Sequence, residues 1–152
     1  MIKMRSAIVE DYEVYKDLWT NIQYQWIYNN EDEPEESSDQ MYICQEDLDY
    51  IDSYYNNFSL DNFKSELKNM KIYMIIKDDS IIGFISLMSC GKGRYKIVDF
   101  PLYKKDLDDI KDVFHILRRT HPDWIFIATT FYPDNVLSLG FKQDKIKSFY
   151  TL

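Results

Sequence analysis

Glycine, proline and cysteine are scarce in this chain of 152 residues, which has four glycines, four prolines and two cysteines. The scarcity of glycine and proline excludes collagen-like and Pro/Gly-rich low-complexity chains. Cys44 and Cys90 belong to no paired-cysteine motif, and the chain has only two histidines, His115 and His121. We therefore expect neither a disulfide framework nor a metal site, and the two free thiols favour a reducing, cytoplasmic compartment.

Long hydrophobic runs are lacking as well. No stretch of about 18 apolar residues occurs, so the sequence predicts no membrane span. Residues 1–10 carry charges and no apolar core of the kind that signal peptides have, so we expect none. With 45% hydrophobic residues and 13 Tyr, 9 Phe and 3 Trp, the composition instead predicts one compact domain over residues 1–152.

Basic residues are missing from Asp17 to Phe63, a segment that holds twelve of the 26 acidic residues. This segment has a net charge of −12, whereas the rest of the chain has 14 acidic and 18 basic residues, a net charge of +4. Such a surface attracts cationic groups and repels phosphate. Together with a pI of about 4.7, it argues against direct nucleic-acid binding and favours a cationic amine or a basic protein as the partner.

Apolar periodicity predicts a strand and two helices in the first half of the chain. In order, the expected elements are a strand at Ile2–Val9, an amphipathic helix opened by Glu10 and Asp11, a solvated loop at 29–39, a partly helical excursion at 40–59 and a helix from Leu60 capped by Ser59. The acidic, aromatic residues 29–58 are thus interpreted as an insertion within the domain.

The second half predicts short strands around one long helix. In order, the expected elements are a hairpin of 72–76 with 81–87, a strand at 94–100, a helix from Asp106, a buried strand at 124–129, a brief helix at 134–139 and a final strand or two at 141–152. The buried stripe of the long helix is expected to be Leu107, Ile110, Phe114 and Leu117. This order predicts an α+β fold with a mixed, mostly antiparallel sheet, a central β-α-β crossover and flanking helices.

Three stretches carry a family resemblance. Arg5 to Tyr12 is a strand leading into an acid-capped helix, Ile75 to Ile85 is a hairpin with Gly83 after its turn, and Leu139-Gly140-Phe141 closes the last expected helix. In these stretches and in its element order, the chain resembles the GNAT family of acetyl-CoA-dependent N-acetyltransferases. The resemblance covers most of the chain except residues 29–58, and it implies a GNAT-like fold with acetyl-CoA as the cofactor.

The cofactor-binding segment departs from the family's pattern. The family has a glycine-rich loop before the crossover helix, where backbone N–H groups cradle the pyrophosphate of coenzyme A. Aligned on Pro101 and Tyr103, this chain has Lys-Lys-Asp-Leu-Asp-Asp at 104–109. The cofactor-binding positions that the resemblance implies are Asp99, Phe100, Lys104, Lys105, Leu107 and Asp109. Leu107 and Asp109 replace glycines, and each aspartate close to a phosphate would cost about 3–4 kcal/mol at an effective dielectric constant near 20.

The resemblance also implies catalytic residues. Asp99, or a water that it holds, is expected to act as the base. The family's tyrosine acid falls on Val136 in this chain, and Tyr132, about one helical turn earlier, is the possible stand-in. The sequence contains no P-loop and no Gly-x-Ser-x-Gly motif, which excludes the NTPase and hydrolase classes that depend on them.

Two functions stay open at this point. The first is acetyl-CoA-dependent acetylation of a cationic amine, held by carboxylates and tyrosine faces of the acidic segment. The second is a binding module that has lost coenzyme A and docks a basic protein partner on the acidic 17–63 surface. The replaced glycines favour the second function, and the overall resemblance favours the first.

Overall fold

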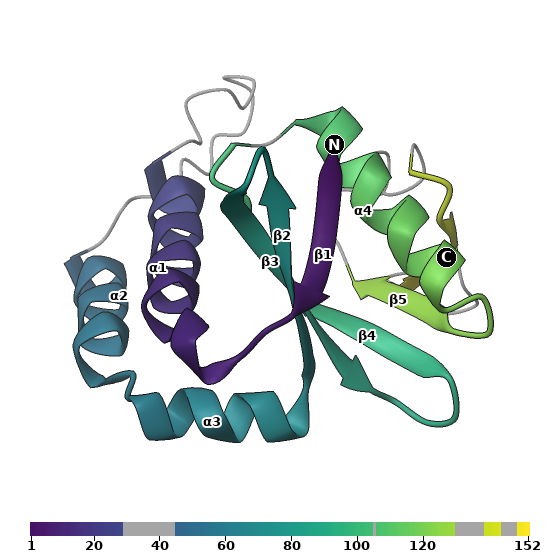
Figure 1. The fold of residues 1–152 in the computed structure, drawn as a ribbon. Coiled ribbons are helices and arrows are strands. Elements are labelled where there is room, and N and C mark those ends of the chain that lie inside the picture. Colours follow the sequence, from purple (N-terminus) through teal and green to yellow (C-terminus); the bar gives the residue numbers. More distant parts are fainter. Residues whose placement is uncertain (29–44, 105, 130–138, 144–148) are drawn as a thin grey trace, which may run out of the picture.

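The computed structural model describes residues 1–28, 45–104, 106–129, 139–143 and 149–152 (Figure 1). Its elements, in chain order, are β1 (Ile2–Ser6), the short 3-10 helix η1 (Val9–Asp11), α1 (Tyr12–Tyr28), α2 (Gln45–Asn57), α3 (Leu60–Asn69), β2 (Lys71–Lys77), β3 (Ser80–Ser89), β4 (Arg94–Asp99), α4 (Leu107–Thr120), β5 (Ile125–Thr129), β6 (Lys142–Gln143) and β7 (Phe149–Thr151). Up to β5 the order agrees with the sequence prediction, except that the excursion forms a further helix, α2, before α3.

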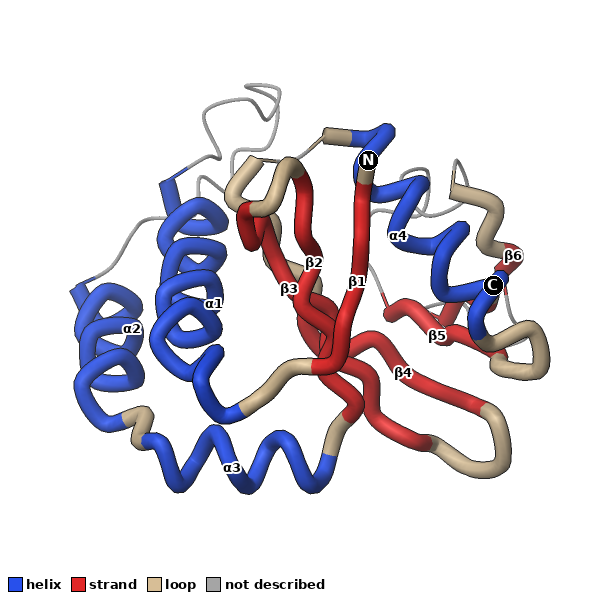
Figure 2. The backbone as a smooth tube through the Cα atoms, in the orientation of Figure 1, coloured by secondary structure: helices blue, strands red, loops and turns tan. Residues whose placement is uncertain are grey.

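The described strands form one seven-stranded sheet in the order β1-β2-β3-β4-β5-β7-β6 (Figure 2). Every neighbouring pair is antiparallel except β4 and β5, which run parallel and are joined through α4. The predicted α+β fold with one β-α-β crossover is therefore confirmed. None of the helices in the described part of the chain has the length and apolar composition that crossing a bilayer requires.

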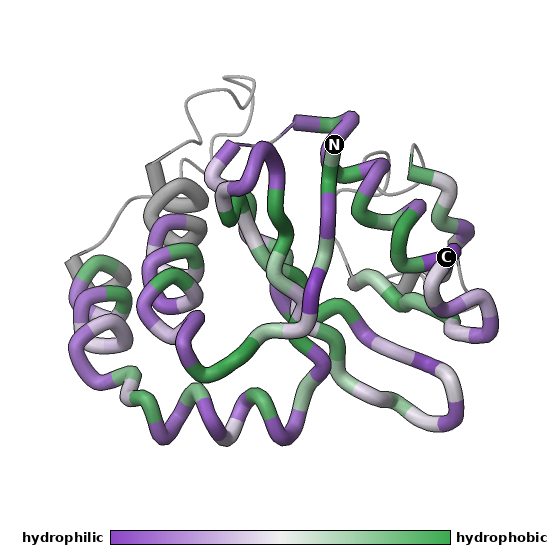
Figure 3. Tube along the Cα trace, viewed as in Figure 1, coloured by the Kyte–Doolittle hydropathy of each residue, from purple (hydrophilic) through white to green (hydrophobic). Residues whose placement is uncertain are grey.

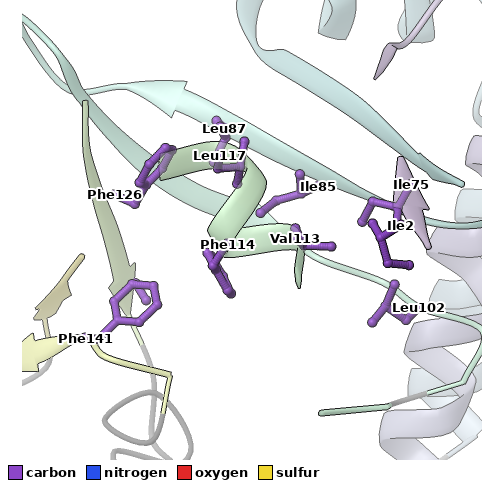
Figure 4. Packing of buried hydrophobic residues seen from close by; sticks show 11 residues of the cluster. Ile2, Ile75, Ile85, Leu87, Leu102, Val113, Phe114, Leu117, Phe126 and Phe141 are labelled. Carbon is purple, nitrogen blue, oxygen red and sulfur yellow. The ribbon is translucent and has the colours of Figure 1, made fainter. Parts of the chain in front are cut away.

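Helices cover both faces of the sheet, and each face has its own core. On one face, α4 packs Val113, Phe114 and Leu117 against β-strand residues such as Ile85 and Phe126 (Figure 4). On the other face, side chains of α1 and α3 meet the opposite side of the same strands; the buried residues there are Tyr15, Leu18, Phe58, Phe63, Ile72, Met74 and Phe84. Hydrophilic and hydrophobic residues alternate along α3 and α4 (Figure 3), as burial of one helix face requires.

Local capping explains where the helices begin. The Ser59 hydroxyl accepts a hydrogen bond from the Asn62 N–H at 3.1 Å, which confirms it as the N-cap of α3. Asp11 is almost fully buried, and its carboxylate accepts hydrogen bonds from both terminal guanidinium nitrogens of Arg5, at 2.7 and 2.8 Å. The Arg5 pair lowers the pKa of Asp11, although burial opposes the shift. The predicted acid-capped start of the first helix is therefore fixed to β1.

The buried stripe of α4 differs from the prediction at one position. Leu107 is 50% exposed, whereas Val113 is completely buried. Leu107 is the first residue of α4, and the buried apolar residues of this helix begin at Val113. Val113, Phe114 and Leu117 then make the continuous helical stripe, so the expectation for Leu107 was wrong. The brief helix expected at 134–139 falls outside the described residues, except for Leu139.

Gly83 in β3 allows the segment after β4 to cross close to the sheet. A Cβ at this position would lie 2.3 Å from the Pro101 carbonyl oxygen and 2.5 Å from Leu102 Cδ2. Gly83 and Leu102 form an isolated antiparallel bridge, and the Phe84 N–H donates to the Pro101 carbonyl at 3.1 Å. Contacts this short leave no room for any side chain, which explains why a glycine, Gly83, follows the hairpin turn.

Replacing Gly83 by alanine should therefore destabilise the protein by about 1–3 kcal/mol, because the new methyl group overpacks the crossing. The positive-φ glycines are Gly91, Gly93 and Gly140, so the backbone of Gly83 itself accepts alanine and the cost arises from the contact alone. Chemical denaturation measures the loss of unfolding free energy, with Ser80→Ala on the same strand as the control. Equal stability of the two variants would show that the segment simply moves aside.

Candidate functional site

The parallel strands β4 and β5 separate after a short pairing. They pair at Arg94 with Ile125, Tyr95 with Phe126 and Lys96 with Ile127. Beyond these pairs, β4 continues along β3 and β5 continues along β7, so the two strands diverge (Figure 1). Within the described residues, residues 97–99 of β4 do not pair with residues 128–129 of β5. Their backbone groups are therefore available to a ligand at the carboxyl ends of two parallel strands, where α/β proteins commonly bind ligands.

A β-bulge lies at the same point of β4. Ser86 pairs with Asp99 and Leu87 pairs with Ile97, so Val98 is the extra residue. The Asp99 N–H donates to the buried Ser86 hydroxyl at 3.0 Å, which fixes the backbone on the far side of the bulge. Bulges re-aim the following side chains. Asp99 is the first residue after the inserted one.

The Asp99 carboxyl shares a half-buried environment with a second acid. Burial raises the pKa of Asp99, and burial is also the first cause of the raised pKa of Glu66 in α3, to which the charge of Asp99 adds. The Tyr15 hydroxyl of α1 donates a hydrogen bond to Glu66 Oε2, which partly offsets that rise. Two carboxyl groups from different elements are thus held where the charged form is disfavoured.

Aromatic rings of α1 and α2 lie beside these carboxyl groups. Trp19 stacks on Tyr54 with ring centroids 3.5 Å apart, and Tyr54 stacks on Phe58 at 5.1 Å. Burial raises the pKa of Tyr54 well above its usual value, and the charges of Glu66 and Asp99 raise it further. The phenol is therefore a neutral hydrogen-bond donor at any physiological pH. Together, Asp99, Glu66, Tyr15 and Tyr54 are called the acid–tyrosine cluster below.

The start of α4 carries less free negative charge than its sequence indicates. Lys77, at the end of β2, places its Nζ 3.0 Å from both carboxylate oxygens of the buried Asp109. The Asp106 carboxylate caps the helix by accepting from the Asp108 N–H at 2.9 Å. Of the three aspartates, only Asp108 is exposed without such a bond in the described structure. Because Lys77 compensates Asp109, a phosphate at the start of α4 would be repelled less strongly than the three aspartates in the sequence indicate.

The structure places the predicted site residues in different surroundings. Asp99 lies in the acid–tyrosine cluster, whereas the Phe100 ring packs edge-on against Phe114, with centroids 5.6 Å apart, and can offer a ligand only its backbone. Lys104 and Leu107 are exposed beside the start of α4. Lys105 and Tyr132 lie outside the described residues.

Glu66 and Tyr15 were missed by the sequence analysis. The available signal was the spacing of Phe63, Glu66, Leu67 and Met70, which places an acid within the apolar stripe of α3. A carboxyl group on a buried helix face needs a partner. That requirement points to the Tyr15 hydroxyl, which the apolar stripe of α1 also buries.

Comparison with known proteins identifies the fold. No protein-family model and no curated protein sequence matches the chain. Among solved structures, the PaiA N-acetyltransferase of Thermoplasma acidophilum in complex with coenzyme A matches with a TM-score of 0.62 at 15% identity, over 99% of this chain and 97% of that one. A GNAT-family acetyltransferase of Staphylococcus aureus Mu50 matches with a TM-score of 0.58 at 14% identity, over 99% and 98%.

An aminoglycoside 6'-acetyltransferase type Ii matches with a TM-score of 0.57 at 10% identity, over 98% of this chain and 93% of that one. Identities this low establish a shared fold and not a shared activity. Together with the splayed β4–β5 pair, they confirm the resemblance seen in the sequence: this chain has the fold of the GNAT N-acetyltransferases.

Proposed function

We propose that this protein transfers an acetyl group from acetyl-CoA to a cationic amine, with Asp99 as the base. The observation that carries the proposal is the half-buried Asp99 carboxyl at the β4 bulge, whose pKa burial raises. A carboxyl group with a raised pKa is a stronger base than a surface aspartate. Asp99 lies at the splayed ends of β4 and β5, so a cofactor bound between these strands would adjoin the base.

The residues around the start of α4 fit the cofactor better than the sequence alone indicated. Lys77 compensates the charge of Asp109, and Leu107 is 50% exposed and does not belong to the core. Lys104, Lys105 and the first-turn N–H groups of α4 other than that of Asp108, which donates to Asp106, would hold the pyrophosphate. Backbone groups at Asp99 and Phe100 would hold the pantetheine arm. When bound, acetyl-CoA supplies an activated acetyl thioester.

The acid–tyrosine cluster would receive the amine. Its two carboxyl groups favour a cationic acceptor, and an ammonium group between them would relieve the charge penalty that raises both pKa values. Tyr54 remains neutral, so its hydroxyl would orient the acceptor through a hydrogen bond, while the buried Tyr15 hydroxyl holds Glu66 in place. Asp99 would remove one proton from the ammonium group, and the neutral amine would then attack the thioester carbonyl. The C–S bond would break as the nitrogen loses its second proton to solvent. We assign Tyr132 the return of a proton to the leaving sulfur.

The second candidate function is docking of a basic protein on the acidic 17–63 surface. Its specific support is the exposure of aromatic residues on α2, where Tyr50 is 65% and Tyr55 37% exposed next to an excess of acids. Exposed tyrosines with an acidic rim are typical of interaction surfaces. Calorimetric titration with acetyl-CoA separates the two functions, because a pure docking module has no affinity for the cofactor.

The variant Asp99→Asn should lower the rate of amine acetylation by about 10²- to 10⁴-fold, the usual contribution of a positioned base, and leave acetyl-CoA affinity unchanged. Its stability should be equal or higher at neutral pH. The folded-state pKa of Asp99 is raised, so the wild-type carboxyl is tolerated best below its unfolded pKa and costs stability as pH rises through the folded pKa.

Steady-state kinetics on a panel of polyamines, with calorimetry and thermal melts, measures these effects. Asp112→Asn, an exposed aspartate in the middle of α4, is the matched control and should retain full activity. Full activity of the Asp99→Asn variant would show that a group other than Asp99 is the base. An absence of acetyl-CoA binding by the wild-type protein would reject acetyl transfer and leave docking as the function.

The ion pair at α4 gives an independent test of cofactor binding. Lys77→Gln should weaken acetyl-CoA binding by about tenfold, because it leaves the Asp109 carboxylate uncompensated near the pyrophosphate. Adding Asp109→Asn should restore the affinity, since the charge is then gone. Calorimetry on both variants measures the change, with Lys111→Gln on the same helix as the control. Equal dissociation constants in all of them would place the pyrophosphate away from α4.

A further inference from the structure

A second pocket lies at the opposite end of α4 from the candidate acetyl-CoA site. It has a volume of about 540 Å³ and forms where α4 ends and the chain turns into β5. Its polar lining comes from His115, Arg118, Arg119 and His121, with Trp124 as an aromatic wall. α4 has 14 residues, so about 20 Å separates this end from the start of the helix. The pocket is therefore distinct from the cofactor site.

The positive charge of this pocket has no counterion in the described structure. Neither Arg118 nor Arg119 forms an ion pair with a described acid. None of the described residues that line the pocket is acidic. Lys71 of β2 adds a further cation, with its Nζ 5.4 Å from the centroid of the Trp124 ring.

Stacked rings hold the pocket wall in place. The His121 and Trp124 rings lie parallel, 3.6 Å apart and at an angle of 4°, and Tyr95 of β4 packs 4.0 Å from the Trp124 centroid. The Tyr73 hydroxyl lies 3.2 Å from His121 Nε2. His121 is therefore fixed by β2 and by its own turn before any ligand arrives. A preformed wall reduces the entropy that ligand binding would cost.

The surroundings of His121 disfavour its protonated form. Burial lowers its pKa, and the charge of Lys71 lowers it further. The Tyr73 hydroxyl also faces the ring, and Arg118 and Asp123 lie within three residues of His121 along the chain. An anion in the pocket would oppose the effect of the cations and stabilise a protonated histidine.

We propose that this pocket binds the phosphate group of a small phosphorylated molecule. Two guanidinium groups and two imidazoles supply forked and single donors, which suit a dianion with three free oxygens. The volume exceeds what phosphate alone needs and lies in the range of small-molecule sites. The proposal does not depend on acetyl transfer, since the pocket shares no residue with the acid–tyrosine cluster or the start of α4.

Histidine NMR tests the site directly, because both histidines of the chain line the pocket. Titration with inorganic phosphate and with AMP should shift both sets of ring signals and raise the pKa of His121. AMP should bind more tightly than phosphate if an organic phosphate is the ligand, and less tightly if the pocket accepts only the free ion. Arg118→Gln/Arg119→Gln should weaken binding of either probe by about tenfold or more.

The control is Lys3→Gln/Lys111→Gln, which changes the net charge equally and touches no residue of the pocket. It should bind phosphate like the wild type, and both double variants should bind acetyl-CoA normally. Four outcomes would overturn the proposal: no shift of either histidine, equal binding of acetate and phosphate, loss of acetyl-CoA and phosphate affinity together, or weaker binding of AMP than of free phosphate. In the first case the arginines serve only the negative end of the α4 dipole.

Discussion

The close crossing of Pro101 and Leu102 over Gly83 positions both halves of the candidate site. It fixes the path of the chain between β4 and α4, and with it the direction in which α4 starts. Because the same segment follows directly on the β4 bulge, Asp99 and the first turn of α4 are held relative to each other through only a few residues. A glycine at this point of β3 is thus a condition for the site's geometry, and not only for the stability of the sheet.

Electrostatics divides the molecule into three regions along this framework. Under α1 and α2, Asp99 and Glu66 are half-buried acids that share Tyr15 and Tyr54 as neutral neighbours. At the start of α4, Lys77 pairs with Asp109, and Asp106 caps the helix, so two of the three aspartates there have partners. At the end of α4, arginines and histidines accumulate with no described acid opposite them. The proposed amine acceptor fits the first of these regions by charge, and the proposed second anion fits the third.

Local sequence signals predicted the fold well and the site only in part. Ser59, Gly83 and the Ile75–Ile85 hairpin act through near neighbours, so their spacing in the chain was informative. The Lys77–Asp109 pair joins residues 32 positions apart, and no periodicity reveals such a pairing. The sequence therefore overestimated the negative charge at α4. Leu107 shows a similar limit at a helix end. Its spacing in the sequence continues the apolar stripe of α4, but the residue is 50% exposed.

The cost of the acid–tyrosine cluster argues for chemistry rather than docking alone. A docking surface needs its carboxylates in solvent, where charge can meet a partner without prior desolvation. Asp99 instead lies where burial opposes its ionised form, and no described cation compensates it. The Tyr15 hydrogen bond gives Glu66 a structural role, whereas the hydrogen bonds between Asp99 and Ser86 involve the backbone of Asp99 and leave its carboxyl without a partner among the described residues. A carboxyl group kept at such a cost is typical of a site that binds a cation or moves a proton.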